Sequence, residues 1–280
     1  MSRVLTGRTA LVTGVTSGIG RATAELLLAA GLRVAGCARD AERLQQVAAE
    51  LPGLVPLPAD LRDAGQRRAL VDEAVARFGQ LDVLVNNAGV GYVGAVVDMD
   101  AGDVERIFAT NSTAVVDLTR LVLPAMMERG DGDVVMLSSS AIWATLPPLT
   151  VYAASKRALD GFTEGLRREV KDAGVRVHSV NPGFVATEFL SRAEHEHPDE
   201  GEAPTSPGTS PQSVAEVVRE ELESGSGRTV AVPRVMELGR LLSVPGVSQV
   251  FDLVVRLGSD PMARLGRIMA DRHSVTDRTG

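Results

Sequence analysis

Tyr152 and Lys156 are the residues of this sequence whose types and spacing best support proton chemistry. On a helix, residues four apart lie on one face, so the phenol and the ammonium would be neighbours. A phenol with a pKa near 10 is a poor base at neutral pH, but a nearby ammonium favours the phenolate and lowers that pKa. Such a pair suits the transfer of a proton to or from a carbinol oxygen. Taken alone, the spacing is equally typical of an ordinary surface pair.

A glycine-rich turn near the N-terminus supplies a second motif. The run T-G-V-T-S-G-I-G occupies residues 13–20, where an apolar strand pattern gives way to a helical one. Gly14 would permit a tight turn, Gly18 would let the backbone approach a pyrophosphate, and Gly20 would allow close packing of helix on strand. The free N–H groups and the dipole of the helix N-terminus would bind the phosphates. An ordinary strand–turn–helix is the alternative for this motif alone.

Further motifs follow this turn in a fixed order. They are A-D-L at 59–61, N-N-A-G at 86–89, S-S-S at 138–140, Y-A-A-S-K at 152–156 and N-P-G at 181–183. With the glycine spacing of the first turn, the series resembles the short-chain dehydrogenase/reductase family over about residues 5–190. The joint occurrence of these motifs by chance is remote.

The resemblance implies a catalytic tetrad of Asn111, Ser139, Tyr152 and Lys156. Ser139 lies 13 residues before Tyr152, which is the interval that the family uses for its substrate-binding serine. Its hydroxyl would polarise the carbonyl that accepts hydride. Asn111 would complete a proton relay through a water, and Lys156 would also orient the cofactor ribose. Nicotinamide would supply the hydride, while the protein supplies position and the proton.

The resemblance also implies which residues contact the cofactor. They lie in the glycine-rich turn, at the ends of the following strands, in the tetrad and around N-P-G: Gly14, Thr16, Ser17, Gly18, Ile19, Arg39, Asp60, Leu61, Asn87, Ala88, Gly89, Tyr152, Lys156, Pro182, Gly183, Val185 and Thr187. No metal site is expected, since the H-x-H of His195 and His197 lies in an acidic loop with no rigid element to present it.

The end of the second strand pattern indicates the choice of cofactor. Family members that select NAD carry an acid there for the ribose 2′-hydroxyl, but this sequence has Ala38 followed by Arg39. An arginine suits a 2′-phosphate through charge-assisted hydrogen bonds. We therefore expect NADP(H), with NAD(H) as the alternative because Asp40 lies only one position further.

Short β-branched runs alternate with helical patterns, and these elements must position the motifs. Strands are expected at 9–13, 33–37, 54–57, 82–85, 134–138, 175–180 and 229–232, with helices at 19–30, 41–50 and 64–77. The strands are apolar on both faces, as in a parallel sheet covered on both sides. The sequence thus predicts an α/β fold: a doubly wound Rossmann-type parallel sheet of about seven strands in one domain.

We expect residues 1–234 to form the dinucleotide-binding and catalytic domain and residues 235–280 a C-terminal helical extension. The polar, Pro- and Gly-rich stretch at 190–212 reads as a mobile substrate loop. Residues 235–258 predict two short amphipathic helices broken at Pro245-Gly246. We hypothesise that this tail and the loop roof a mainly apolar pocket. Trp143, Leu146 and Leu149 would face substrate, although the loop that holds them has Ile142 where many family members have glycine.

Composition excludes several classes of protein. The net charge is −7, and residues 191–224 hold nine acids against two arginines. Nucleic acid is therefore an unlikely partner. Apolar stretches are too short to span a membrane and no signal peptide is recognised, while the one cysteine, Cys37, fits a reducing cytoplasm. In the tail, Arg240 and Arg256 are matched by acids, which disfavours membrane contact.

The sequence predicts an NADP-dependent oxidoreductase that interconverts an alcohol and a ketone or aldehyde, with a small, mainly apolar substrate. An NAD-dependent alcohol or hydroxysteroid-type dehydrogenase is a second hypothesis. A nucleotide-sensing regulator on the same fold is a third, which the intact Tyr152–Lys156 pair disfavours. By resemblance, the protein would form a homodimer or homotetramer through the helices that carry Asn111 and Tyr152.

Overall fold

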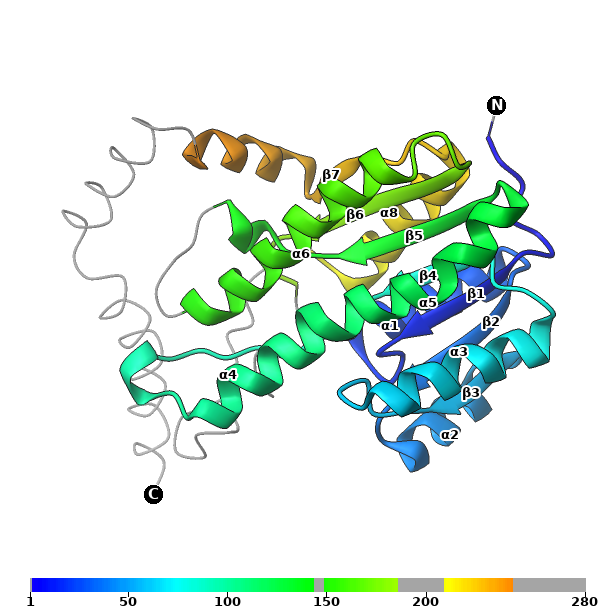
Figure 1. Cartoon of the computed structure of the whole chain (residues 1–280), viewed down its shortest axis with the longest axis horizontal. Coiled ribbons are helices and arrows are strands. Elements are labelled where there is room, and N and C mark those ends of the chain that lie inside the picture. The colour runs from blue at the N-terminus through cyan, green and yellow to red at the C-terminus, as the bar shows by residue number, and fades with distance from the viewer. Residues whose placement is uncertain (1, 144–148, 186–208, 244–280) are drawn as a thin grey trace, which may run out of the picture.

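A computed structural model describes residues 2–143, 149–185 and 209–243. Seven strands form one parallel sheet in the order β3-β2-β1-β4-β5-β6-β7 (Figure 1). The strands are β1 (Thr9–Thr13), β2 (Arg33–Ala38), β3 (Leu54–Pro58), β4 (Val83–Asn86), β5 (Gly132–Leu137), β6 (Val175–Pro182) and β7 (Thr229–Val232). The predicted doubly wound Rossmann-type sheet is confirmed, and the predicted strand ends differ by two residues at most.

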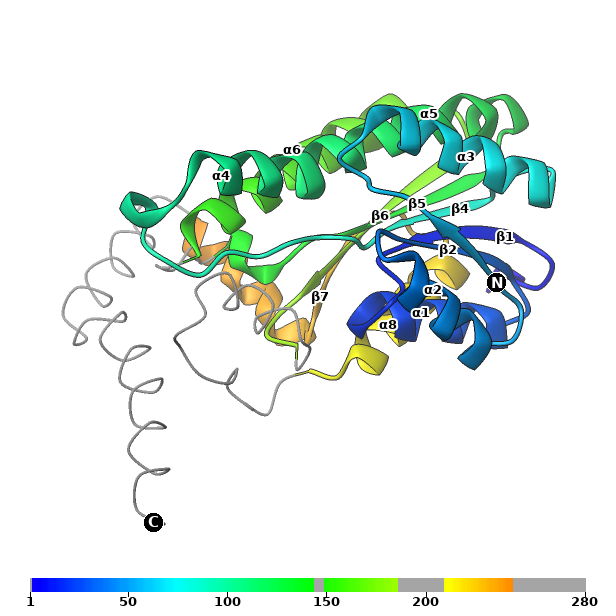
Figure 2. The ribbon, with the colours of Figure 1, turned by 90° about the horizontal axis from the view of Figure 1, so that it is seen from below.

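Helices cover both faces of the sheet (Figure 2). They are α1 (Gly18–Ala29), α2 (Ala41–Glu50), α3 (Ala64–Phe78), α4 (Ala101–Phe108), α5 (Ala114–Arg129), α6 (Thr150–Glu169) and α8 (Pro211–Ser224). Three short helical turns are also present: the 3-10 turn η1 (Val96–Asp98), the π-helical turn η2 (Ala109–Thr113) and the 3-10 turn η3 (Ser140–Ile142). The longer 3-10 helix η4 (Arg234–Ser243) follows β7. Asp40, Asp63 and Ser210 begin α2, α3 and α8 as side-chain caps.

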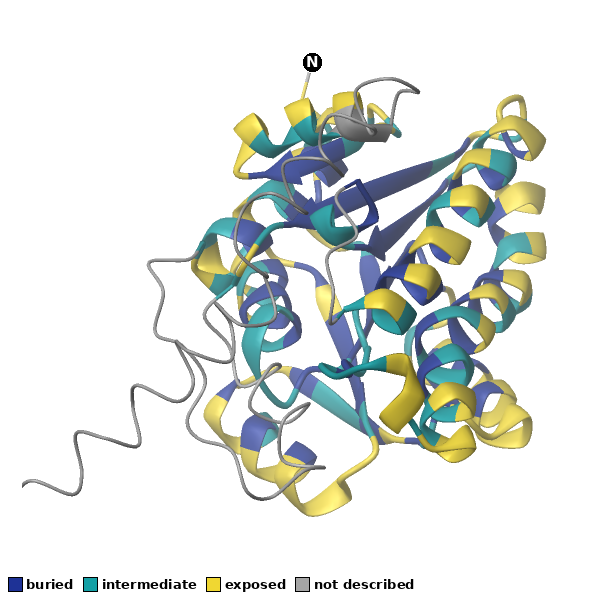
Figure 3. Cartoon of the chain, turned by 90° about the vertical axis from the view of Figure 1, so that its left-hand side faces the viewer, coloured by how far each residue is buried: buried dark blue, intermediate teal, exposed yellow. Residues whose placement is uncertain are grey.

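Two apolar cores lie on the two faces of the sheet. One packs α3, α5 and α6 against the strands through side chains such as Leu70, Leu118 and Leu159. The other packs α1, α2 and α8 through Leu27, Leu44 and Leu222. Strands β1, β4 and β5 are buried along their whole length, which explains why their sequences are apolar on both faces (Figure 3).

A buried charge cluster ties together the amino ends of β5 and β6. The carboxylate of Asp133 is fully buried and binds Arg3, Arg8 and Arg176 at 2.7–2.9 Å and His178 Nε2 at 3.0 Å. Burial would raise the pKa of Asp133, but hydrogen bonds with His178, Arg176 and Arg3 hold it well below its usual range. His178 is itself fully buried within β6.

Glu221 of α8 completes the cluster beside His178. Its side chain is buried and accepts hydrogen bonds from Arg228 Nη2 at 2.7 Å and from the Ser226 hydroxyl at 2.6 Å. Although burial opposes it, these bonds and the interaction with His178 lower the pKa of Glu221 to about 2. Every charge in this cluster therefore has a partner, as buried charges require.

The C-terminal extension differs from its prediction. We expected amphipathic α-helices over 235–258, but the described part, Arg234–Ser243, is a 3-10 helix that begins one residue after Pro233. Its first residues are fixed to the body: Met236 N donates to Pro233 O at 3.0 Å, and Glu237 Oε1 accepts from Ala231 N at 3.3 Å. The second predicted helix and the 190–208 part of the predicted loop lie outside the described residues.

Candidate active site

The glycine-rich turn between β1 and α1 has the predicted geometry. Gly14 and Gly18 adopt φ angles of +74° and +54°, which side chains other than glycine rarely accept. A Cβ on Gly20 would lie 2.1 Å from the carbonyl oxygen of Gly14, so only glycine lets the helix pack this closely. The turn therefore leaves a backbone cradle at the N-terminus of α1, where N–H groups are free to bind an anion.

Exposure distinguishes the residues of this turn that could contact a cofactor from those that pack it against the sheet. The residues predicted to contact a cofactor are partly exposed: Gly14, Thr16, Ser17, Gly18 and Ile19. The intervening Val15 and Gly20 are buried and pack the turn against the sheet. The residues present thus fit the pyrophosphate of a dinucleotide, because the accessible positions coincide with the free end of the helix.

Asn87 braces the turn from the neighbouring strand. Its side-chain nitrogen donates to the carbonyl oxygens of Thr13 at 2.8 Å and Gly14 at 3.2 Å. In return, the Thr13 hydroxyl accepts from the backbone nitrogens of Asn87 and Ala88, both at 3.0 Å. Thr13 was not among the predicted site residues; its place directly before the first glycine was the available signal.

Asp60 forms an ion pair at the end of β3. Arg62 donates to its carboxylate through Nε and through Nη2 at 2.6 Å. These hydrogen bonds lower the pKa of Asp60 to about 2, and the charge of nearby Arg39 acts in the same direction. Arg39 itself is exposed, whereas the side chain of Leu61 is buried in the apolar core, which leaves only its backbone to reach a ligand.

Asp40 is committed to a structural contact. Its carboxylate caps α2 by accepting from Arg43 N at 2.9 Å. Since that oxygen already serves the helix, Asp40 is a poorer candidate for a ribose hydroxyl than its position one step after Arg39 suggested.

Asn111 lies in the π-helical turn η2 between α4 and α5. Its side chain is fully buried; Oδ1 accepts from Val90 N at 2.8 Å, and Nδ2 donates to Val90 O at 2.9 Å and to Ser155 Oγ at 3.0 Å. These bonds join the segment after β4 to α6. The helix predicted around Asn111 is confirmed, but its wider turn, frequent at functional sites, was not expected.

Ser139, Tyr152 and Lys156 come together at the carboxyl end of β5. The side chains of Ser139 and Tyr152 share a hydrogen bond. Lys156 is buried, and its Nζ donates to the carbonyl oxygen of Leu137 at 2.9 Å. A Cβ on Gly89 would lie 3.3 Å from Asn111 Oδ1 and 3.5 Å from Lys156 Nζ, so this glycine adjoins both side chains. The structure thus brings the four predicted tetrad residues to one site.

Burial controls the protonation of this pair. It raises the pKa of Tyr152 to about 12, and the hydrogen bond with Ser139 only partly opposes that shift. Burial also lowers the pKa of Lys156 to about 8. The expected lowering of the phenol pKa by the ammonium is therefore wrong for this structure, in which burial raises that pKa and Ser139 supplies the one opposing contribution. At neutral pH, Tyr152 holds its proton and is poised as an acid.

The N-P-G turn ends β6 and packs against β7 and η4. Pro182 ends the strand, and Gly183 N donates to Val232 O of β7 at 2.8 Å. Val185 forms a parallel bridge with Thr209, whereas Thr187 lies outside the described residues. A Cβ on Gly183 would lie 2.3 Å from Met236 Sδ, which shows how closely η4 packs on this turn.

Trp143 joins the tetrad loop to the C-terminal extension. It forms a small buried cluster with Ile142 and Ala231, against which Met236 packs. We predicted that Trp143, Leu146 and Leu149 face substrate; Trp143 is only 9% exposed, Leu146 lies outside the described residues, and Leu149 precedes α6 as its N-cap residue. The role of Met236 was missed because the tail was expected to pack as α-helices.

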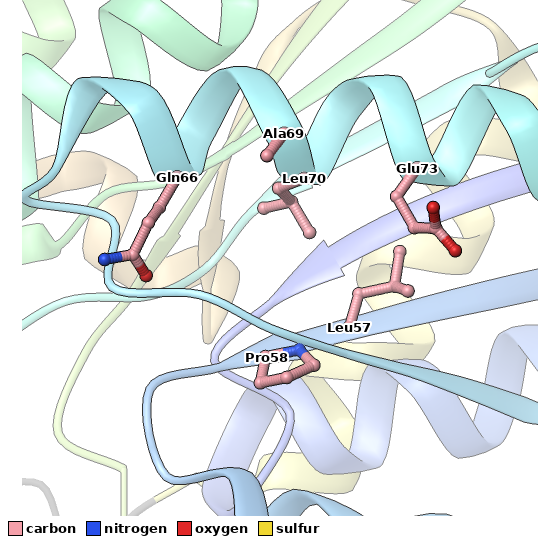
Figure 4. A pocket seen from close by; sticks show the side chains of 6 residues that line it. All are labelled: Leu57, Pro58, Gln66, Ala69, Leu70 and Glu73. Atoms are coloured by element: carbon pink, nitrogen blue, oxygen red, sulfur yellow. The ribbon is translucent and has the colours of Figure 1, made fainter.

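A separate hollow lies between β3 and α3, lined by Leu57, Pro58, Gln66, Ala69, Leu70 and Glu73 (Figure 4). It contains no tetrad residue, and Gln66 links it to the site only by accepting from Asp60 N at 2.8 Å. Cys37 is buried in β2, and this burial raises the pKa of its thiol to about 12, as is typical of an unreactive core cysteine. Within the described ranges, no cluster of three metal-binding side chains occurs, and no helix is long and apolar enough to cross a membrane.

About two thirds of the chain resembles known proteins. The model of the family described as short chain dehydrogenase matches residues 8–198. Dehydrogenase/reductase SDR family member 7B of Bos taurus is 38% identical over 193 residues, covering 65% of this chain and 59% of that protein. Very-long-chain 3-oxoacyl-CoA reductase of Anas platyrhynchos is 39% identical over 191 residues, covering 65% and 61%. The matched part of the chain thus spans about three fifths of these relatives.

Solved structures share the fold over most of the chain. A 3-ketoacyl-(acyl-carrier-protein) reductase from Brucella melitensis, complexed with NADH, superimposes with a TM-score of 0.75 at 26% identity and covers 81% of this chain and 97% of its own. The F189W actinorhodin polyketide ketoreductase with NADPH gives a TM-score of 0.74 at 32% identity and covers 83% and 97%.

Proposed function

The chain belongs to the short-chain dehydrogenase family, and on that premise we propose that it is an NADP-dependent oxidoreductase that reduces a ketone or aldehyde to an alcohol. The observation that carries the proposal is the junction of Ser139, Tyr152 and buried Lys156 beside the glycine-rich cradle. A phosphate-binding turn and an acid for a carbonyl oxygen then lie at one end of one sheet, where open α/β sheets bind ligands.

Each tetrad residue has a distinct task in this proposal. Tyr152 donates its proton to the carbonyl oxygen, and Ser139 donates a hydrogen bond to the same oxygen as charge develops there. Lys156 binds the ribose hydroxyls and replaces the proton that Tyr152 gives up. Asn111 holds the segment after β4 against α6 through Val90 and Ser155. The nicotinamide cofactor, when bound, supplies the hydride.

The other predicted contacts hold the dinucleotide in this proposal. Gly14, Thr16, Ser17, Gly18 and Ile19 bind the pyrophosphate with the N-terminus of α1. Residues that follow the other strands line the adenine, ribose and nicotinamide positions: Asp60, Leu61, Asn87, Ala88, Gly89, Pro182, Gly183 and Val185. Thr187, which lies outside the described residues, is added to this set by family resemblance alone.

Arg39 supports NADP over NAD. It is exposed immediately after β2, where it can meet a 2′-phosphate, and Ala38 supplies no carboxylate for a 2′-hydroxyl. Asp40 is occupied as the cap of α2. One solved relative binds NADH and another NADPH, so the preference rests on these residues of the chain itself.

A 3-oxoacyl chain is the substrate class that best agrees with the relatives. Two are named as ketoacyl or oxoacyl-CoA reductases and one as a polyketide ketoreductase. The apolar surroundings of the site, Trp143, Ile142 and Met236, favour a substrate that is mainly hydrocarbon beyond its carbonyl.

We further propose a homo-oligomer that forms through α5 and α6, as family resemblance implies. Val116 and Met127 of α5 are 38% and 42% exposed and would be covered in such an interface. The free thiol of Cys37 in β2 is compatible with a reducing cytoplasm.

The proposed function is tested by assaying the purified protein with a 3-oxoacyl thioester and each reduced cofactor, following the loss of cofactor absorbance. We expect turnover with NADPH at a kcat/KM at least about tenfold above that with NADH, since a charge-assisted bond to the phosphate contributes about 1.5–3 kcal/mol. Binding of both cofactors without turnover of any ketone or aldehyde would overturn the proposal.

A further inference from the structure

A buried arginine of α3 connects helix α5 to the segment that follows β3. Arg67 is the one arginine that is buried among the described residues, with 6% of its surface exposed. Its Nε donates to Asp117 Oδ2 of α5 at 2.6 Å, and its Nη1 donates to Leu61 O at 2.7 Å. Apolar side chains would suffice to pack two helices, whereas a buried guanidinium needs partners for its charge and its hydrogen bonds. Arg67 therefore does more than join two helices, since it also fixes a backbone carbonyl that lies outside both.

Asp117 holds the guanidinium of Arg67 in place. One of its oxygens binds Arg67 and the other accepts from Arg120 Nη2 at 2.7 Å. Burial would raise the pKa of Asp117, but the hydrogen bonds from Arg67 and Arg120 lower it, so the carboxylate is ionised at neutral pH. Because Arg120 is exposed and Arg67 is buried, the carboxylate binds one arginine at the surface and one in the interior.

The turn after β3 is held at several points but keeps one backbone donor free. Asp60 N donates to Gln66 Oε1 at 2.8 Å, and Arg62 N donates to Asp60 Oδ1 at 3.0 Å. Both contacts are local to the turn and the first residues of α3, whereas the ion pair of Arg67 ties the turn to α5. Between these fixed points, Leu61 N donates to no acceptor among the described residues. The turn thus presents an unused N–H donor next to the carboxylate of Asp60.

We propose that Arg67, held by Asp117, is a positioning residue that presents Leu61 N to the adenine ring of the cofactor. This inference rests on the proposed function and deepens it, because it names the contacts that set the affinity for the adenine half. A carboxylate beside an N–H donor is complementary to the amino group and the ring nitrogen N1 of adenine. Asp60 keeps an acceptor position beside Arg62, since a carboxylate can accept about four hydrogen bonds.

The alternative is that the ion pair only joins α3 to α5. Figure 2 shows both helices on the same face of the sheet, where they share one apolar core, and this arrangement fits either role. If the role were only structural, loss of the ion pair would destabilise the protein without changing which base the cofactor site prefers. A measurement of base preference therefore separates the two explanations.

The test compares the full chain with Asp117→Asn and Arg67→Lys, with Arg120→Ala as the matched control. Asparagine keeps the size of Asp117 without its charge, and a lysine ammonium cannot replace the planar fork of Arg67. Arg120→Ala removes the other partner of the same carboxylate and leaves Arg67 in place. Each protein is titrated with NADPH and with reduced nicotinamide hypoxanthine dinucleotide phosphate, whose N1 carries a hydrogen and cannot accept from Leu61 N. The readout is the ratio of the two dissociation constants.

We expect wild type to bind NADPH at least about tenfold more tightly than the hypoxanthine analogue, and Arg120→Ala to keep this ratio. Asp117→Asn and Arg67→Lys should each lower the ratio by about three- to tenfold, the range that corresponds to one net hydrogen bond. Because the two ligands differ only in the base, a partial loss of folded protein leaves the ratio unchanged. Urea unfolding of each variant shows that it is folded, and either variant suffices for the comparison.

Base preference and turnover can fail independently. A lowered ratio in the two variants, without turnover of any ketone or aldehyde by wild type, would overturn the proposed oxidoreductase and leave the role of Arg67 standing. Carbonyl reduction together with an unchanged ratio in folded Arg67→Lys would overturn that role alone, as would a wild type that does not distinguish the two bases. An unchanged ratio in folded Asp117→Asn would show that Asp117 does not hold Arg67 for this purpose.

Discussion

At the residue scale, the protonation states of Tyr152 and Lys156 decide whether the proposed proton donor is ready at neutral pH. Burial holds the pKa of Tyr152 at about 12, so the phenol is protonated over the whole neutral range and can act as an acid without prior proton uptake. The pKa of Lys156 lies at about 8, so its ammonium begins to lose its proton just above neutral pH. At neutral pH the protonated phenol is therefore ready to act as the acid that the proposed carbonyl reduction requires.

The rate of carbonyl reduction should accordingly be flat up to about pH 8 and fall above it, as the Lys156 ammonium is lost while Tyr152 stays protonated. The measurement is kcat/KM for reduction between about pH 6 and pH 10. In Lys156→Arg, the side chain remains charged throughout, so the fall above pH 8 should disappear even though the overall rate is lower. An unchanged fall in that variant would assign the titration to another group.

Arg39→Ala should weaken NADPH binding by about tenfold or more and leave NADH binding nearly unchanged, because only NADPH carries the 2′-phosphate. Fluorescence titration of both reduced cofactors measures this directly, with Arg43→Ala on the next helix as a control for general loss of positive charge. Equal losses for the two cofactors would indicate a folding effect and make NAD the favoured cofactor.

Residue types at fixed intervals were enough to predict the tetrad, because the chemistry requires those types and the fold fixes their order. What the sequence could not provide were the contacts that depend on three-dimensional approach. Asn87 braces Thr13, and Asp60 is paired with Arg62, although neither partnership has a spacing signal. The raised pKa of Tyr152 likewise follows from burial, which a spacing argument does not measure.

At the scale of elements, the first turn and helix α1 show why particular glycines are required. Gly20→Ala would place a Cβ 2.1 Å from the backbone oxygen of Gly14, which cannot move without distorting the cradle. Gly161→Ala in α6 is the matched control for Gly20→Ala, because nothing lies within 4 Å of the new Cβ.

We expect Gly20→Ala to lower the free energy of unfolding by about 1–3 kcal/mol and to weaken cofactor binding. Gly161→Ala should raise it by about 0.4–1 kcal/mol, since alanine restricts the unfolded chain. Urea unfolding of both variants gives the comparison. Equal stability of the two variants would mean that α1 does not need this close approach.

Strands and α-helices were predictable because buried parallel strands and capped helices have strong local patterns. The runs at 9–13 and 229–232 were found at their observed bounds. The 3-10 form of η4 was not predictable, since its apolar residues at 235, 238 and 241 also fit an α-helical spacing of three and four. The packing of Met236 on Gly183 distinguishes the 3-10 form from an α-helix, and that contact joins residues far apart in the sequence.

At the scale of the whole molecule, the two ends of the sheet have different tasks. The amino ends of β5 and β6 carry the paired charges around Asp133, and the carboxyl ends carry the tetrad. Because Asp133 and Glu221 have lowered pKa values, their contribution to stability is fully present above their ordinary pKa near 4 and is lost as the pH falls toward 2.

Asp133→Asn should lower the free energy of unfolding at pH 7 by about 3–5 kcal/mol, because Arg3, Arg8 and Arg176 lose their shared buried partner. It should also make stability less dependent on pH between about pH 4 and pH 2. Urea unfolding at a series of pH values measures both effects. A variant with the acid dependence of wild type would show that Asp133 does not carry it.

The central claim is that Tyr152 delivers the proton in a reaction that this chain catalyses. Tyr152→Phe removes only the phenolic hydroxyl, so single-turnover oxidation of bound NADPH by a 3-oxoacyl thioester tests the claim most directly. We predict a fall in this rate of about 100-fold or more with nearly unchanged affinity for NADPH. A rate close to that of wild type would contradict the account.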